Sequence, residues 1–214
     1  MAEFTFYTVA MSRGQISRWA LHEVGADYEH VVFDWATRPA DYADINPMNK
    51  VPALVHHHRQ KDGGSHDHVV TEAAAINHYL AETHPDKGLL PDAHERAAYF
   101  RWLFFSAGPL EQAVVAKAMG WEVPEERAGM AGFGSLEKTL SAMEGWLKTH
   151  DYVTGERFTM ADTYVGSQFV WGLRFGSIPE QPAFKAYVER VTQRPAYAEA
   201  NAIDAKLMEE GGEA

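Results

Sequence analysis

The feature that most constrains this chain is the segment NPMNKVPALV at 46–55, where a polar stretch gives way to an apolar strand through a proline. Pro52 has no N–H to give to a sheet ladder, so its place before Ala53 marks a sheet edge or a special turn. Val51-Pro52 is a candidate cis peptide bond, although a trans bond entering a strand is the commoner arrangement. A cis bond would leave the N–H and C=O of Val51 facing outward, as an edge with which a small extended peptide can pair.

The composition narrows the class of protein. The 214 residues suffice for one large or two small domains with a sizeable core. The chain has no cysteine, which excludes disulfides, thiolate zinc sites and a protein thiol as nucleophile. Its net charge of -11 argues against nucleic acid or an anionic membrane as partner, because both need a basic face. Without a basic, apolar leader or a membrane-length apolar run, a soluble cytoplasmic protein is expected.

The first part of the chain reads as a strand, a helix and a second strand. Aromatic and β-branched runs at 4–9 and 28–33 predict the strands. Ser12 stands at the N-cap of the helix with Gln15 three residues later, which predicts a capping box, and Gly25 stands where a C-cap belongs. This order predicts a right-handed βαβ unit.

After an irregular or short helical segment at 34–46, two more strands and a helix are expected. The strands lie at 53–56 and 68–70, are antiparallel and are joined by a polar turn at 59–65, and the helix follows at 72–80. The order β-α-β-(α)-β-β-α predicts a small mixed sheet with helices.

The second half carries helical periodicity throughout. After a linker at 88–92, Pro109 is expected to kink or restart a helix. Ser135 opens the next helix, and Thr159 with Asp162 predicts a capping box for a buried central helix. A loop at 120–134, helices at 184–194 and 196–208, and a disordered tail at 209–213 complete the expected pattern.

Three motifs, in order along the chain, resemble one known family. Val51-Pro52 before the third strand and TEAAAI at 71–76 resemble the thioredoxin-like half of cytosolic glutathione transferases of bacterial type. The segment FTMAD at 158–162 is similar to the capping box of that family's helical domain. The resemblance spans nearly the whole chain and implies an α/β plus all-α fold. It implies a thioredoxin-like domain at 1–84, a linker at 85–92 and an all-helical domain at 93–214.

The same resemblance implies how glutathione is bound. Val51 would pair its main chain with the cysteinyl unit, Pro52 would hold the turn, and Lys50 would meet a carboxylate of glutathione, although a solvated loop lysine explains Lys50 equally well. Glu72 would take the γ-glutamyl ammonium, while the helix N-terminus and the N–H of Ala73 would take the carboxylate beside it. The family usually has a serine at the position of Ala73, so its absence lowers the expected affinity.

The resemblance also places an activator of the glutathione thiol after the first strand. Ser12 ranks first, because a hydroxyl donor at a helix N-terminus favours a thiolate over a thiol. Tyr7, at the end of the first strand, is the rival, and Arg13 is the candidate electrostatic helper, so the choice between a serine-type and a tyrosine-type site stays open. Capping alone would explain Ser12, but capping uses a lone pair and leaves the hydroxyl proton free to donate.

Two further groups of side chains are candidates for binding: a set of aromatic residues and a set of histidines. In the family the electrophile site lies between the first helix of the second domain and the glutathione edge, and the candidates for its apolar wall are Phe104, Phe105, Trp121 and Trp171. The arms of the expected hairpin carry five histidines: His56, His57, His58, His66 and His68. Alternate histidines on paired strands can bind a divalent metal. Because no carboxylate or cysteine completes a set, the expectation is a solvated hairpin without metal.

The expected protein is thus a homodimeric glutathione transferase, which takes glutathione as co-substrate and conjugates it to small hydrophobic electrophiles. A glutathione-dependent isomerase, peroxidase or etherase would use the same thiolate differently. A binding or regulatory protein that has lost catalysis is the third hypothesis, and Ala73 favours it. Fold alone does not decide among the three.

Overall fold

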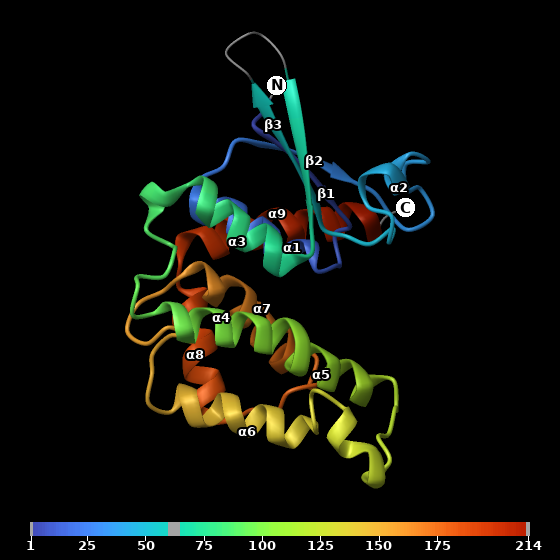
Figure 1. Ribbon diagram of the computed structural model, residues 1–214. Helices are drawn as coiled ribbons and strands as arrows, with labels where there is room; N and C mark the ends of the chain where they lie inside the picture. Colours follow the sequence, from blue (N-terminus) through green and yellow to red (C-terminus); the bar gives the residue numbers. More distant parts are fainter. Residues whose placement is uncertain (1, 60–64, 213–214) are drawn as a thin grey trace. The chain divides into compact units, whose positions relative to one another are not determined.

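The computed structural model describes residues 2–59 and 65–212, and the chain divides into two compact units (Figure 1). Unit 1 comprises Met1–Lys87 and Arg194–Ala214, and unit 2 comprises Gly88–Gln193. This division differs from the expected one at the end of the chain, because the last helix packs within unit 1 and not with the other helices.

Unit 1 has the expected thioredoxin-like fold. Its elements are β1 (Phe4–Thr8), α1 (Gly14–Val24), β2 (Tyr28–Val32), α2 (Tyr42–Ile45), β3 (Ala53–Arg59), β4 (Ser65–Thr71), α3 (Ala73–Thr83), the 3-10 turn η1 (Pro85–Lys87) and α9 (Pro195–Gly212). The strand order is β2-β1-β3-β4, with β1 parallel to β2 and the other pairs antiparallel. Both hairpin arms are longer than predicted, and most of the predicted turn, 60–64, lies outside the described residues.

The two faces of β1 bury different side chains. Phe4 and Phe6 are fully buried on one face, and the guanidinium of Arg18 on α1 lies 5.3 Å from the ring of Phe6. Tyr7 points to the other face and packs against the cluster around Tyr42. This alternation follows from the two-residue period of a strand and gives unit 1 a core on each side of its sheet.

The last helix is joined to α1 by both apolar and charged contacts. Trp19 packs edge-on against Tyr197 at 5.0 Å between ring centroids, and Arg194, just before α9, pairs with Glu23 at 2.6 Å. The helix continues to Gly212, so the prediction of a disordered tail is wrong for 209–212, while Glu213 lies outside the described residues.

Apart from one isolated bridge between Tyr152 and Gly155, the described secondary structure of unit 2 is helical, as predicted. Its elements are α4 (Arg96–Phe105), the π-helical turn η2 (Ser106–Leu110), α5 (Glu111–Ala118), the 3-10 helix η3 (Glu125–Met130), α6 (Leu136–Leu147), α7 (Met160–Arg174) and α8 (Pro182–Thr192). Pro109 lies inside η2, which joins α4 to α5, because proline cannot donate to the regular ladder. The expected loop at 120–134 contains η3. Within the described ranges, no helix has both the length and the apolar character needed to cross a bilayer.

Candidate active site

Three chain segments leave the sheet of unit 1 at the same end. The register pairs Tyr7 with Ala53, and Ala53 with Thr71. Such neighbours lie about 4.5–5.5 Å apart across antiparallel strands. The segment after β1, the segment before β3 and the segment after β4 therefore meet at one edge. These are the segments that carry the predicted glutathione-binding residues.

The central segment is shaped by the proline. The Val51-Pro52 bond is cis, which confirms that prediction. The side chain of Val51 is buried in the cluster with Tyr42, and the carbonyl of Lys50 accepts hydrogen bonds from Tyr42 Oη at 2.7 Å and Asn46 Nδ2 at 2.8 Å. Among the described residues, no hydrogen bond engages the N–H or C=O of Val51. Its main chain is therefore available to an extended ligand.

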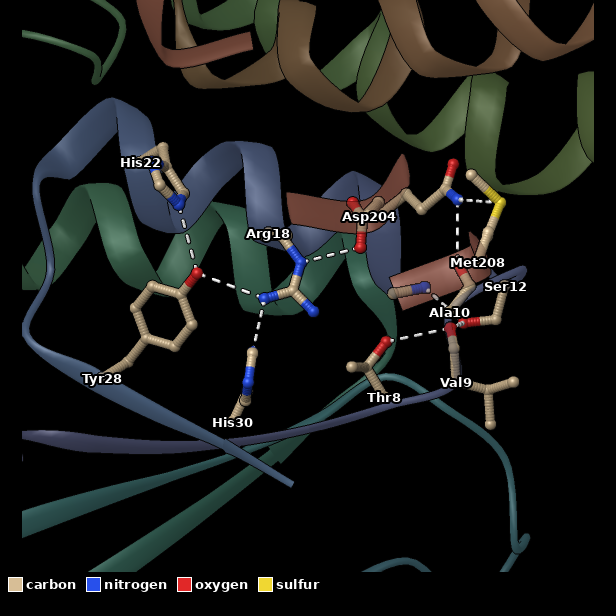
Figure 2. Close-up of polar contacts among 12 residues, drawn as sticks. Thr8, Val9, Ala10, Ser12, Arg18, His22, Tyr28, His30, Asp204 and Met208 are labelled. Atoms are coloured by element: carbon tan, nitrogen blue, oxygen red, sulfur yellow. Dashed lines mark hydrogen bonds and ion pairs between the residues drawn. The ribbon is translucent and has the colours of Figure 1, made fainter. Parts of the chain in front are cut away.

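The Ser12 hydroxyl lies in the segment after β1, nearly buried at 9 % exposure (Figure 2). It donates to the carbonyl of Val9 at 2.6 Å and accepts from the N–H of Gly14 at 3.0 Å. The hydroxyl proton, which was expected to be free, is thus engaged with a neutral carbonyl. A ligand thiolate would have to compete with Val9 for it.

The predicted capping box of Ser12 and Gln15 is wrong. The helix begins at Gly14, and the Gln15 side chain donates to the carbonyl of Ala10 at 2.8 Å and lies 3.8 Å from Met208 Sδ on α9. The Gln15 amide thus contacts the loop between β1 and α1 and the last helix, and it does not bond to the Ser12 N–H.

Gly14 shapes the candidate site and was not predicted to do so from the sequence. A Cβ at this position would collide with Thr8 Oγ1 and lie 3.1 Å from Ser12 Oγ. Only glycine lets the start of α1 approach the end of β1 this closely. A glycine directly after Ser12 and Arg13 was the available sequence signal.

Tyr7, the rival activator, points to the opposite face from Phe6. Its ring lies 5.5 Å from that of Tyr42, and its pKa is raised, first by burial and then by the charge of Asp41. The phenol therefore stays neutral near pH 7, where it is a hydrogen-bond donor and not a base.

The third segment enters α3 through a strained residue. Glu72 is the N-cap of α3 with φ 68, a left-handed conformation that is costly for a residue other than glycine. Its side chain is exposed, while Ala73 behind it is 7 % exposed. The first intrahelical bond runs from the N–H of Ile76 to the carbonyl of Glu72, so the N–H groups before Ile76 face the open end of the helix. An exposed carboxylate beside a helix N-terminus matches a ligand group that carries both an ammonium and a carboxylate.

Comparisons with known proteins identify the family to which the chain belongs. The family model described as glutathione S-transferase, N-terminal domain matches residues 2–82, and the model of the C-terminal domain matches residues 99–195. The chain belongs to the glutathione S-transferase family.

Individual relatives are similar over nearly their full length. Glutathione S-transferase 3 of Zea mays is 28% identical over 216 residues, with 92% of each chain covered. A probable maleylacetoacetate isomerase of Caenorhabditis elegans is 31% identical over 199 residues, with 86% of each covered. A sphingomonad glutathione S-transferase solved in complex with glutathione is 27% identical, with a TM-score of 0.71 and coverage of 94% of this chain and 98% of that one.

Two predicted charged residues of this transferase-family chain lie exposed near the edge. Lys50 is exposed and directly precedes Val51. Arg13 occupies the N-cap position of α1, next to Ser12. Both sit where an anionic ligand at this edge would meet positive charge in an otherwise acidic protein.

The four predicted electrophile-site aromatics all belong to unit 2 but do not form a cluster there. Phe104 and Trp121 are exposed, at 66% and 63%. Phe105 packs against Trp102 within α4, and Trp171 packs against Phe175, the residue that follows α7. Among the described residues, no ring contact joins any two of the four.

Proposed function

We propose that the protein is a glutathione transferase that holds glutathione at the sheet edge of unit 1 and activates its thiol for attack on small hydrophobic electrophiles. The observation that carries the proposal is the register that brings Ser12, the cis Val51-Pro52 bond and Glu72 to one edge. The family membership of both halves of the chain supports it.

Glutathione would lie extended along this edge. The free main chain of Val51 would pair with the cysteinyl unit, as in β-strand addition. Glu72 would accept the γ-glutamyl ammonium, and the N–H groups at the start of α3, from Ala73 on, would bind the neighbouring carboxylate. Lys50 would meet the other carboxylate of the tripeptide.

Ser12 would stabilise the thiolate by exchanging its acceptor. In the free protein its hydroxyl donates a hydrogen bond to the Val9 carbonyl. A hydrogen bond to an anion is about twice as strong as one to a neutral acceptor, so the hydroxyl would donate to a nearby thiolate instead. Arg13 adds positive charge. Tyr7 remains the rival, as a neutral donor from the other face of β1.

The test of the activator is a pair of variants, Ser12→Ala and Tyr7→Phe, assayed for conjugation to an aryl halide between pH 6 and 9. Losing a hydrogen bond to a charged group costs about 1.5–3 kcal/mol, so Ser12→Ala should lower kcat/KM by about 10–100-fold and raise the apparent pKa of the rate. Its affinity for glutathione, measured by calorimetry, should stay near normal. An unchanged profile for Ser12→Ala with an inactive Tyr7→Phe would reverse the assignment.

Ala73 offers a test of the binding site itself. Ala73→Ser adds a hydroxyl at the first position of α3, where it can donate to the γ-glutamyl carboxylate. We expect glutathione to bind about tenfold more tightly in calorimetry. Equal affinity in the two proteins would mean that the carboxylate binds elsewhere or already has its donors.

A second candidate function comes from the relatives. One of them bears the name maleylacetoacetate isomerase, and such a reaction would use the same thiolate for addition and release instead of conjugation. A panel of aryl halides, hydroperoxides, aryl ethers and maleylacetoacetate separates these activities.

We further propose that the protein is a cytoplasmic homodimer acting in detoxification, with Phe104, Phe105, Trp121 and Trp171 contributing to the electrophile site. Saturable glutathione binding with no turnover on any substrate would favour the non-catalytic alternative.

A further inference from the structure

Histidines occupy one face of the β3–β4 hairpin. The register places His56 opposite His68 and His58 opposite His66. Because side chains alternate along a strand, these four project from the same face, and His57 projects from the other. The sequence shows the histidines, but only the register shows which of them share a face.

The rings on this face lie close together. The ring centroids of His58 and His68 are 4.6 Å apart, as are those of His66 and His68. Two imidazoles bound to one tetrahedral Zn²⁺ through bonds of about 2.0–2.1 Å have centroids about 5 Å apart. The spacing of these three rings is therefore close to the spacing that a shared ion requires.

His56 forms the base of the cluster and is not a ligand candidate. It is 6 % exposed, its ring centroid lies 3.7 Å from that of His58, and both of its nitrogens have neighbours. Nδ1 lies 2.8 Å from Tyr79 Oη, and Nε2 lies 3.4 Å from a carboxylate oxygen of Glu3. The contact of His58 Nε2 with Tyr79 Oη, at 3.4 Å, leaves its Nδ1 for an ion.

We propose that His58, His66 and His68 bind a divalent cation that favours imidazole, such as Zn²⁺, with water at the fourth position. In the side-chain conformations described, no three donor groups yet converge on one point. Binding therefore requires ring rotation, which His66 and His68 allow because both are exposed. This site lies toward the opposite end of the hairpin from Ala53 and Thr71, and it does not depend on the proposed transferase activity.

His57 provides a matched control on the same hairpin. Its Nε2 lies 2.8 Å from Thr5 Oγ1 and its Nδ1 lies 3.0 Å from Asp67 Oδ1, on the face away from the cluster. A variant at His57 removes a histidine next to His58 in sequence without removing a proposed ligand.

The experiment is a calorimetric titration of the full chain, produced without a histidine tag, with ZnCl₂ and separately with MgCl₂. We expect one Zn²⁺ per chain and no heat with Mg²⁺, which prefers oxygen ligands. His66→Ala combined with His68→Ala should weaken Zn²⁺ binding at least about tenfold, and so should His58→Ala alone, because a lost ligand costs no less than a lost second-shell partner. His57→Ala should bind Zn²⁺ as the parent protein does.

Several results would overturn the site. They are no saturable Zn²⁺ binding, equal weakening in His57→Ala, or full binding in the His66→Ala, His68→Ala protein. That double variant changes only exposed side chains, so it tests the proposal even where His58→Ala fails to fold, and circular dichroism checks the fold of each protein. Shifts of the His58, His66 and His68 ring nitrogens in NMR spectra on adding Zn²⁺, with the His57 ring unchanged, would identify the ligands directly.

Discussion

Two buried aspartates, one in each unit, hold helices in place by different means. In unit 2, Asp162 is fully buried and accepts hydrogen bonds only from neutral donors: the N–H groups of Val153 and Thr159, the Thr159 hydroxyl and the Tyr187 hydroxyl. In unit 1, Asp204 on α9 is 2 % exposed and pairs with the fully buried Arg18 on α1 at 2.8 Å (Figure 2).

The two arrangements differ in the groups that would lose their partner if the carboxylate were removed. Removing Asp162 would leave neutral donors without an acceptor, whereas removing Asp204 would leave a charge. Arg18 has neutral contacts at Nη1, with Tyr28 Oη at 3.2 Å and His30 Nδ1 at 3.1 Å, and within the described residues its Nη2 has no hydrogen-bond partner. A buried charge without its partner costs more than a buried neutral group. Unit 1 should therefore be the more sensitive of the two to loss of its aspartate.

The largest effect is expected from Asp204→Ala. It leaves the Arg18 guanidinium buried and uncompensated, which should reduce the free energy of unfolding by about 3–5 kcal/mol. Urea unfolding measures the loss, and hydrogen exchange locates it. Faster exchange should appear in α1 and α9 before it appears in α7.

The double variant Arg18→Met, Asp204→Leu is the control for this prediction. It replaces the pair with apolar side chains of similar size, which is often neutral or stabilising. Recovery of most of the lost stability would show that the cost is the unpaired charge. If the double variant is as unstable as Asp204→Ala, the pair itself, and not the orphaned cation, holds α9 on α1.

Asp162→Ala should have the next largest effect, about 2–3 kcal/mol. Each buried donor left without an acceptor costs about 1–3 kcal/mol, but main-chain relaxation at a helix N-terminus recovers part of it. Hydrogen exchange should now accelerate in α7 first. A loss larger than that of Asp204→Ala, measured in the same urea series, would contradict the ranking of the two regions.

The contrast between the two aspartates also explains which contacts could be predicted from the sequence. The Thr159 and Asp162 capping box was predictable because its partners are three residues apart, and the structure confirms it. The Arg18 and Asp204 pair joins residues 186 apart, so no local pattern predicts it, and the grouping of α9 with unit 1 was not expected from the sequence. The order of strands and helices along unit 1 and the candidate cis bond were predictable because apolar periodicity and proline chemistry act locally.

Local spacing alone was not sufficient, however. Ser12 and Gln15 have the same spacing as Thr159 and Asp162, yet they form no capping box. Close packing of Gly14 against Thr8 sets the start of α1, and the Gln15 amide finds the Ala10 carbonyl instead. The segments of the candidate site follow from local motifs, but the engaged proton of Ser12 and the strained φ of Glu72 depend on packing that a sequence does not show.

The smallest expected effect is a difference in pH dependence. Burial raises the pKa of Asp162 from its ordinary 3.8 to about 6, against the opposing hydrogen bonds from Val153, Thr159 and Tyr187. Burial also raises the pKa of Asp204, but there the positive charge of Arg18 opposes it. Because the pKa of Asp162 is higher in the folded state, protonation of this carboxyl stabilises the fold. This contribution to the free energy of unfolding is complete below pH 3.8 and is lost as the pH rises through about 6.

Comparison with Asp162→Asn isolates this contribution, because the amide does not titrate and all other groups are shared. Between pH 7 and pH 5 the parent protein should gain about 1 kcal/mol of stability relative to Asp162→Asn, since one pKa unit corresponds to about 1.4 kcal/mol. Urea unfolding of both proteins at several pH values measures the gap. A gap that stays constant between pH 7 and pH 5 would mean that the four neutral donors outweigh burial and keep Asp162 ionised. In that case the two aspartates would be alike in charge and would differ only in their partners.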